Sequence, residues 1–256
     1  MTDGIAVRQA EETMAYLMHV SVPVHDTDAR HIARPSSVWR WLQEAANRQM
    51  RAEGPSYDEL MERGLSFLLS RMCVDFIRPI EQYEELTAET FALPSRGFSF
   101  ERGYRLIDAA GKTVAAGLSI WALYDLNAGR LARVETLGSG YSGGDAPEVS
   151  APVRFTIPET VALEPVGKRK VVWSDVDVNL HVNNTGYPNI LCDFLPDPGA
   201  GQLLSMSLNY RSEAKLGETV TVLRGEETTP EGLRRYWFRT LAGEKINVEA
   251  VMDFRF

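Results

Sequence analysis

Six polar residues that can accept, donate or carry a proton lie close together in the segment WSDVDVNLHVNNTGYPNILCDFL, residues 173–195. They are Asp175, Asp177, Asn179, His181, Asn183 and Asn184. A carboxylate two or four residues from an imidazole can orient the ring and raise its basicity. The run leads into an expected helix, whose first backbone N–H groups can stabilise a developing oxyanion. This composition predicts a hydrolytic site that uses no metal.

The same residues also have plain structural explanations. An Asp-x-Asp-x-Asn run is usually a turn, Asn183 and Asn184 are good helix caps, and His181 can be a hydrogen-bonded structural group. If the run is extended, alternation places five side chains on one side: Asp175, Asp177, Asn179, His181 and Asn183. We favour the catalytic interpretation and keep the structural one as its alternative.

Composition limits the function classes. The chain has 256 residues and a formal net charge of -8, which suits one large or two small domains and disfavours nucleic acid, since phosphate binding needs clustered Lys and Arg. The two cysteines, Cys73 and Cys192, give neither a disulfide framework nor zinc-ligand spacing. No segment resembles a membrane span, a secretory signal or a transit peptide, and no Gly-rich phosphate-binding fingerprint suggests a nucleotide. We expect a cytoplasmic protein without metal or cofactor.

The order of elements repeats along the chain. Residues 74–90 align with 208–224 at an offset of 134, and residues 104–120 align with 236–252 at an offset of 132. Asp26 and Asp28 align with Asp175 and Asp177 at an offset of 149. Each half predicts a strand, a polar loop, a helix and further alternating strands. The predicted helices span 36–53, 56–63 and roughly 184–195, and two of the predicted strands span 66–76 and 205–211.

One helix followed by antiparallel strands predicts an α+β unit with the helix packed on the sheet. Two copies predict a pseudo-dimer within one chain, joined by the Gly-, Ser- and Pro-rich stretch 138–152. The helix at 36–53 carries a core face with i, i+3, i+4 spacing, part of which can line a long apolar pocket. Its residues are Val38, Trp39, Leu42, Ala45, Ala46, Gln49 and Met50.

The string from Asp177 to Asn184, DVNLHVNN, followed by Tyr187 and Asp193, resembles the acyl-acyl-carrier-protein (acyl-ACP) thioesterases of plants and bacteria. The stretches LSRM at 69–72 and LNYRSE at 208–213 extend the resemblance over nearly the whole chain. It implies two tandem hot-dog domains, each an antiparallel sheet wrapped around a long helix. The first, 1–137, would bind the acyl chain, and the second, 153–256, would be catalytic.

The resemblance also implies a catalytic set, namely Asp177, Asn179, His181 and Glu213. Glu213 or His181 would act as general base toward water, or Glu213 would attack the thioester itself. Asn179 and backbone N–H groups would hold the thioester oxygen, and Asp177 would orient its neighbours. Ala214 occupies a position where many members of the family have a cysteine, which removes a Cys–His mechanism on that strand.

The first half lacks this set. At these offsets the counterpart of Glu213 is Pro79, and Asn179 falls near Arg30. His31 has no partnering Asn, and we interpret it as a surface loop residue. One half is therefore expected to hold the chemistry and the other to hold the acyl chain.

Three further features have weaker functional interpretations. Cys192 suits core packing, and Asp193 suits a helix-end ion pair better than a second base. The triplet Lys168, Arg169 and Lys170 is either a solvated face or a docking site for an acidic carrier protein.

The function implied is hydrolysis of fatty acyl-ACP to a free fatty acid in fatty acid biosynthesis, with acyl-carrier protein as partner. The alternatives are an acyl-CoA thioesterase and a non-catalytic acyl-binding protein. A homodimer, the acyl chain length and the degree of saturation stay open.

Overall fold

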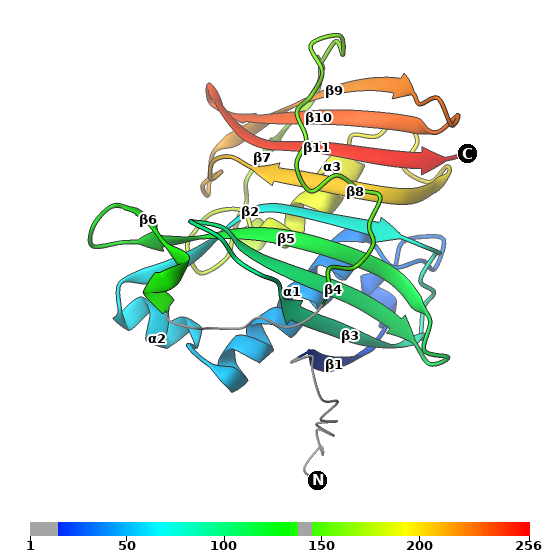
Figure 1. Cartoon of the computed structure of the whole chain (residues 1–256). Helices are drawn as coiled ribbons and strands as arrows, with labels where there is room; N and C mark the ends of the chain where they lie inside the picture. The colour runs from blue at the N-terminus through cyan, green and yellow to red at the C-terminus, as the bar shows by residue number, and fades with distance from the viewer. Residues whose placement is uncertain (1–14, 138–144) are drawn as a thin grey trace.

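The computed structural model describes residues 15–137 and 145–256, which form one large antiparallel sheet with few helices (Figure 1). The strands of the first half are β1 (Tyr16–Ser21), β2 (Leu65–Phe76), β3 (Glu85–Ala92), β4 (Phe100–Asp108), β5 (Thr113–Asp125) and β6 (Arg130–Ala132). Those of the second half are β7 (Glu164–Lys170), β8 (Gln202–Tyr210), β9 (Thr219–Thr228), β10 (Arg234–Ala242) and β11 (Lys245–Arg255). The helices and 3-10 turns are α1 (Pro35–Glu53), α2 (Tyr57–Glu62), α3 (Tyr187–Cys192), η1 (Val24–Asp26), η2 (Val134–Leu137), η3 (Trp173–Asp175) and η4 (Asn184–Gly186). The expected α+β architecture is confirmed.

The strand order has the same sequence of elements on either side of its centre. From edge to edge it runs β1-β3-β4-β5-β2-β8-β11-β10-β9-β7, with β6 added to β5. The two halves meet where β2 pairs antiparallel with β8, in a register that sets Cys73 opposite Ser207. Those two residues are separated by the offset of 134 found in the sequence, so the repeat and the centre of the sheet coincide.

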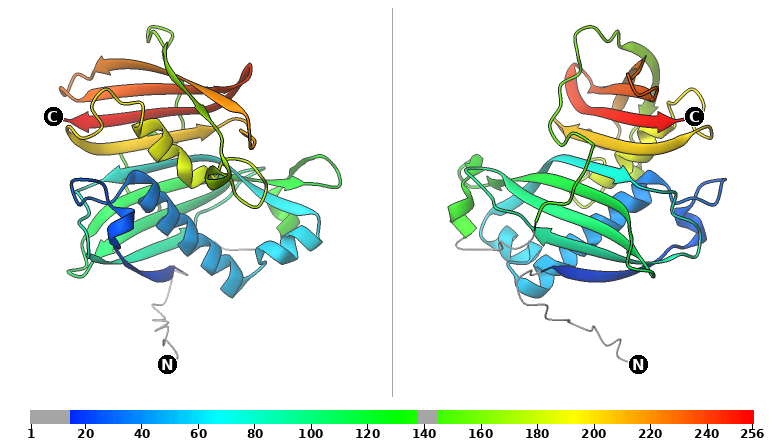
Figure 2. Two further views of the ribbon diagram at one scale, coloured as in Figure 1. Left: turned by 180° about the vertical axis from the view of Figure 1, so that it is seen from behind. Right: turned by 45° about the vertical axis from the view of Figure 1, so that its right-hand side comes forward.

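Helix α1 begins at Pro35, whose fixed φ suits the first helical turn. Its apolar stripe is buried against the sheet, with Val38, Trp39 and Leu42 fully inaccessible to solvent. Helices α1 and α3 lie on one side of the sheet, where α1 packs on β1, β3 and β4 (Figure 2). The predicted core face of α1 is confirmed.

The expected helix at 184–195 is wrong in length. The structure has the short 3-10 turn η4 followed by α3, which spans only six residues. Pro196 and Pro198 lie just beyond it, and the residue before a proline disfavours the helical region. The second half therefore does not wrap around a long helix.

The connection between the halves crosses the outer face of the sheet (Figure 1). Part of the predicted linker, 138–144, lies outside the described residues. From 145 to 163 the chain has no helix or strand, and the backbone N–H groups of Ser150 and Ala151 donate to the Asp75 carboxylate on β2. Phe155 packs on Trp237 with ring centroids 6.0 Å apart. The connection is thus longer than predicted and tied to both halves.

No helix among residues 15–137 and 145–256 is both long enough and apolar enough to cross a membrane.

Candidate active site

A tight hairpin built from residues 175–183 presents two of the candidate side chains. Val176 bridges to Val182, and the backbone N–H of Asp177 donates to the carbonyl oxygen of His181 at 3.0 Å. Leu180 takes a left-handed φ of 62° at the tip. Because the chain reverses here, Asp177 and His181 come together on one side.

The expected alternation of five polar side chains on one side is wrong, because the run is a hairpin and not an extended strand. Asp175 pairs with Arg169, and Asn183 caps η4 by accepting from the Thr185 N–H at 2.9 Å. Asp175 and Asn183 lie on the wall of a different pocket from Asp177 and His181. The capping role considered for Asn183 is therefore the one observed.

The imidazole of His181 lies between two carboxylates. Its Nδ1 is 3.7 Å from Asp177 Oδ1, and its Nε2 is 3.8 Å from Glu213 Oε1. Glu213 arrives from the segment after β8, which is fixed by a bridge between His181 and Lys215 and by the Val182 N–H donating to Ala214 at 2.9 Å. The His181 side chain is 18% exposed and that of Glu213 is 55% exposed. Catalytic hydrogen bonds in ligand-free sites are often this long and shorten on substrate binding.

Asn179 lies at the exposed end of the hairpin. Its backbone N–H donates to Asp177 Oδ1 at 2.9 Å, so Asp177 anchors the turn as well as facing His181. The carboxamide of Asn179 lines the same pocket as the three ionisable residues and has no hydrogen bond to another described residue. The structure therefore brings together the four residues expected from the sequence, and the carboxamide is free to donate to a ligand.

Two tyrosines support the loop after the hairpin. The Tyr210 hydroxyl donates to the carbonyl oxygen of Asn184 at 3.0 Å, and the rings of Tyr187 and Tyr210 meet edge to face with centroids 5.9 Å apart. Burial raises the pKa of both phenols above the ordinary value, so both hydroxyls stay neutral. Alternation in the sequence predicted only that Tyr210 is a core residue of its strand. Nothing in the sequence indicated its hydrogen bond to Asn184.

A cavity of about 2440 Å³ connects this site to the first half. At one end it is lined by the hairpin and the segment after β8. It continues along α1, β2 and β5, where its wall carries apolar side chains that include Ala46, Met50, Phe67, Leu69 and Trp121. The cavity therefore combines apolar side chains of the first half with polar and charged side chains at the hairpin end.

The first half has a second hairpin at the matching position. We call it closed because its Asp28 and Arg30 side chains are held in contacts within the protein. His31 is left-handed, with φ 62°, as Leu180 is. Asp28 binds the guanidinium of Arg30, which also donates to the carbonyl oxygen of Gly201 at 2.9 Å. The pocket on this side measures about 760 Å³. His31 is exposed, with its Nδ1 2.8 Å from Gln82 Oε1, as expected of a surface loop residue.

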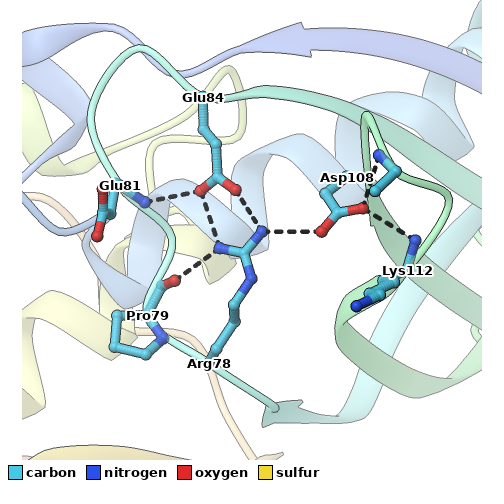
Figure 3. A network of polar contacts seen from close by, with 7 residues as sticks. Arg78, Pro79, Glu81, Glu84, Asp108 and Lys112 are labelled. Atoms are coloured by element: carbon cyan, nitrogen blue, oxygen red, sulfur yellow. Dashed lines mark hydrogen bonds and ion pairs between the residues drawn. The ribbon is translucent and has the colours of Figure 1, made fainter.

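The turn that carries Glu213 also has a counterpart in the first half. The Lys215 N–H donates to Glu218 at 2.7 Å, as the Glu81 N–H donates to Glu84 at 2.8 Å, so Pro79 stands where Glu213 stands. Beside it Arg78 joins Glu84 to Asp108 (Figure 3). Although burial opposes ionisation, Arg78 holds the pKa of Glu84 below its ordinary value. This ion-pair network has no catalytic carboxylate at the Glu213 position.

Known protein families account for most of the chain. The acyl-ACP thioesterase N-terminal domain matches residues 13–136, and the acyl-ACP thioesterase C-terminal domain matches residues 164–255. The chain belongs to the acyl-ACP thioesterase family.

The chain has a related sequence in plants. It is 22% identical over 241 residues to the chloroplastic acyl-acyl-carrier-protein hydrolase FATB2 of Cuphea viscosissima. That similarity covers 88% of this chain and 58% of the relative, so the chain spans less than two thirds of the relative's length.

Three solved structures share the fold nearly end to end. A protein from Lactobacillus plantarum described as an oleoyl thioesterase has a TM-score of 0.82 at 20% identity, covering 95% of this chain and 96% of that one. An acyl-ACP thioesterase from Bacteroides thetaiotaomicron has a TM-score of 0.81 at 18% identity, covering 94% and 98%. A 12:0-ACP thioesterase from Umbellularia californica has a TM-score of 0.80 at 17% identity, covering 94% and 94%.

The other polar candidates in this member of the acyl-ACP thioesterase family lie away from the cavity. Asp193 ends α3, is 64% exposed and lies 3.8 Å from Arg169, which supports the helix-end ion pair. Lys168 and Lys170 are exposed, whereas Arg169 is half-buried in its pair with Asp175. The basic triplet is therefore two surface lysines around a structural arginine. Within the described ranges, no group of three or more His, Cys, Asp or Glu is placed to hold a metal ion.

Neither cysteine is expected to take part in hydrolysis. Burial raises the pKa of Cys73 and of Cys192 to about 12, so both thiols stay protonated near neutral pH. We predict that Cys73→Ala and Cys192→Ala each leave kcat for thioester hydrolysis within a small factor of the native value. Abolished turnover in a folded Cys192→Ala protein would instead indicate nucleophilic chemistry on α3.

Proposed function

We propose that this protein hydrolyses the thioester of a fatty acyl-acyl-carrier protein and releases a free fatty acid. The observation that carries the proposal is the His181 imidazole between the carboxylates of Asp177 and Glu213, at one end of a cavity that continues into the first half. A structural histidine would not require an adjoining cavity of this size. Fatty acid biosynthesis is the process that such a product would serve.

We further propose that the chain is two tandem hot-dog domains, 1–137 and 153–256, with different duties. The mirrored strand order and the β2–β8 pairing support the tandem arrangement. The apolar wall formed by α1, β2 and β5 favours the first domain as the binding site of the acyl chain. The closed hairpin at Asp28 and Arg30 favours catalysis in the second domain alone.

In the mechanism that fits this geometry, a water molecule attacks the thioester carbon through its oxygen, and Glu213 removes a proton from that water. Asn179 donates to the carbonyl oxygen as negative charge develops. The carbon–sulfur bond then breaks, and His181 gives a proton to the departing thiolate while Asp177 keeps the ring oriented. Attack by Glu213 itself would form a mixed anhydride, and single-turnover hydrolysis in ¹⁸O-labelled water detects it when water cleaves it at the Glu213 carbonyl carbon. Label carried by Glu213 after turnover identifies the anhydride.

Hydrolysis of matched acyl-ACP and acyl-CoA thioesters over a series of chain lengths tests the proposal. Faster release from acyl-ACP supports it, whereas faster release from acyl-CoA makes the protein an acyl-CoA thioesterase. Binding of both without turnover would leave only an acyl-binding protein.

The two surface lysines of β7 give a test of carrier docking. Because the chain is acidic overall, exposed cations that are free of ion pairs are the groups suited to steer an acidic carrier. We predict that Lys168→Glu together with Lys170→Glu raises KM for acyl-ACP more than KM for acyl-CoA. Arg169 is left intact because its pairing with Asp175 supports the hairpin. Equal effects on both substrates would remove this surface from the interface.

A further inference from the structure

The side chain of Gln43 on α1 has no hydrogen bond to another residue of the ranges 15–137 and 145–256, although it lies on the wall of the large cavity. It lines that cavity together with Asp177, His181 and Glu213. Its Oε1 atom is buried without a hydrogen bond, which leaves Nε2 as the end that faces the open part of the pocket.

The internal repeat indicates what Gln43 faces. At the offset of 149, its counterpart on α3 is Cys192, which lines the smaller pocket with Asp28 and Arg30. The counterparts of Asp28 and Arg30 are Asp177 and Asn179, which share the wall of the large cavity with Gln43. In each pocket, the residue at this helix position therefore lies on the same wall as the two hairpin residues.

Direct packing agrees with this placement. Helix α1 contacts both η4 and α3, and the Ser36 N–H at its start donates to Asn189 Oδ1 of α3 at 3.3 Å. The turn η4 begins three residues after His181. Helix α1 therefore reaches the turn that follows the hairpin, from the other half of the chain.

We propose that Gln43 is a catalytic residue supplied by the first half, whose Nε2 donates a hydrogen bond to the thioester carbonyl oxygen opposite Asn179. This inference rests on the proposed thioesterase function. In the reaction the carbon–oxygen bond to water forms and the carbon–sulfur bond breaks, while Gln43 exchanges no proton. It stabilises the charge that collects on the carbonyl oxygen.

The Gln43 amide nitrogen is a donor without a hydrogen bond to another described residue, on the wall of a cavity that can hold a ligand. A substrate carbonyl oxygen in that cavity would supply the missing acceptor. In the smaller pocket the corresponding helix position is Cys192, and Arg30 is bound to Asp28 and Gly201.

Two substitutions at one position separate this role from a structural one. Gln43→Met keeps the length of the side chain and removes the donor, and Gln43→Glu keeps its shape and replaces the donor with an acceptor. We expect each to lower kcat for acyl-ACP by about 10²-fold, the loss typical of one oxyanion donor, with KM changed much less. The matched control is Glu44→Gln on the solvent face of α1, where Glu44 pairs with Arg48, and it should keep native kcat.

The melting temperature is the second readout. Gln43→Met removes an unsatisfied buried atom, so Tm should stay level or rise while kcat falls. A fall in Tm that parallels the loss of activity would mean a structural role and would overturn the inference. Native kcat in Gln43→Met, with an active wild type, would also overturn it and leave the thioesterase function intact.

If the wild-type protein hydrolyses no thioester, the proposed function fails, and Gln43 is then tested by binding. The probe is an acyl chain joined to the carrier protein through an amide, which keeps the carbonyl oxygen and resists hydrolysis. Weaker binding by Gln43→Met than by wild type supports the hydrogen bond. Equal affinity of the two proteins contradicts it.

Discussion

Replacing His181 by alanine is expected to lower kcat for acyl-ACP hydrolysis by about 10²–10⁴-fold, the contribution of a positioned acid–base group. Its imidazole lies within 4 Å of both Asp177 and Glu213, so its removal breaks the connection between the two carboxylates. Glu213→Gln should cause a loss of the same order because the amide cannot accept a proton, and Asn179→Ala should show the loss typical of an oxyanion donor.

Stability and a control variant complete this test. All three positions are at least partly exposed, and substitutions at such sites change the free energy of unfolding by about 0.5 kcal/mol or less. Asp193→Asn is the matched control, since its carboxylate lies on α3 outside the cavity. Native rates in His181→Ala and Glu213→Gln would show that the hairpin is structural.

Trp39→Ala is expected to lower the free energy of unfolding by about 3–5 kcal/mol, the usual cost of deleting a large buried aromatic side chain. Trp39 is fully buried on α1 and stacks on Phe76 of β2 with ring centroids 6.3 Å apart. Its loss would leave a void between the long helix and the central strand. Denaturant unfolding followed by circular dichroism measures the change.

The control for this substitution lies on the other face of the same helix. Arg48 pairs with Glu44 at the surface, and breaking such an i, i+4 pair costs about 0.3–0.5 kcal/mol. A cost for Trp39→Ala no larger than that of Arg48→Ala would mean that α1 is not packed on the sheet as described.

Periodicity was enough to predict the strands and α1, because their alternating or helical apolar positions face one continuous core. The strand expected at 205–211, for example, ends within one residue of β8, although β8 begins earlier, at Gln202. The same reasoning failed at 184–195, where two downstream prolines shorten the helix, an effect that apolar spacing does not reveal. It also placed Asp175 with Asp177, because a left-handed residue such as Leu180 reverses the chain without a sequence signal as clear as glycine.

The local sequence pattern predicted only those site residues that lie within the segment 173–195. The hairpin residues are neighbours in the chain, and the resemblance added Glu213. Gln43 was absent from the expected set because it lies 134 residues or more from the others and falls beside the apolar stripe of α1, where helical spacing gives a surface position. Only folding of the two halves onto one sheet brings it to the cavity.

The two halves belong to one polypeptide and pair with each other through β2 and β8. In an assembly of two identical chains, any substitution occurs at two places at once, so a change that closes one pocket closes both. Here Arg30 can block one side while Asn179 leaves the other open. Fusion thus permits division of labour: the closed side is free to gain stabilising contacts, and the open side keeps the unsatisfied polar groups that a substrate needs.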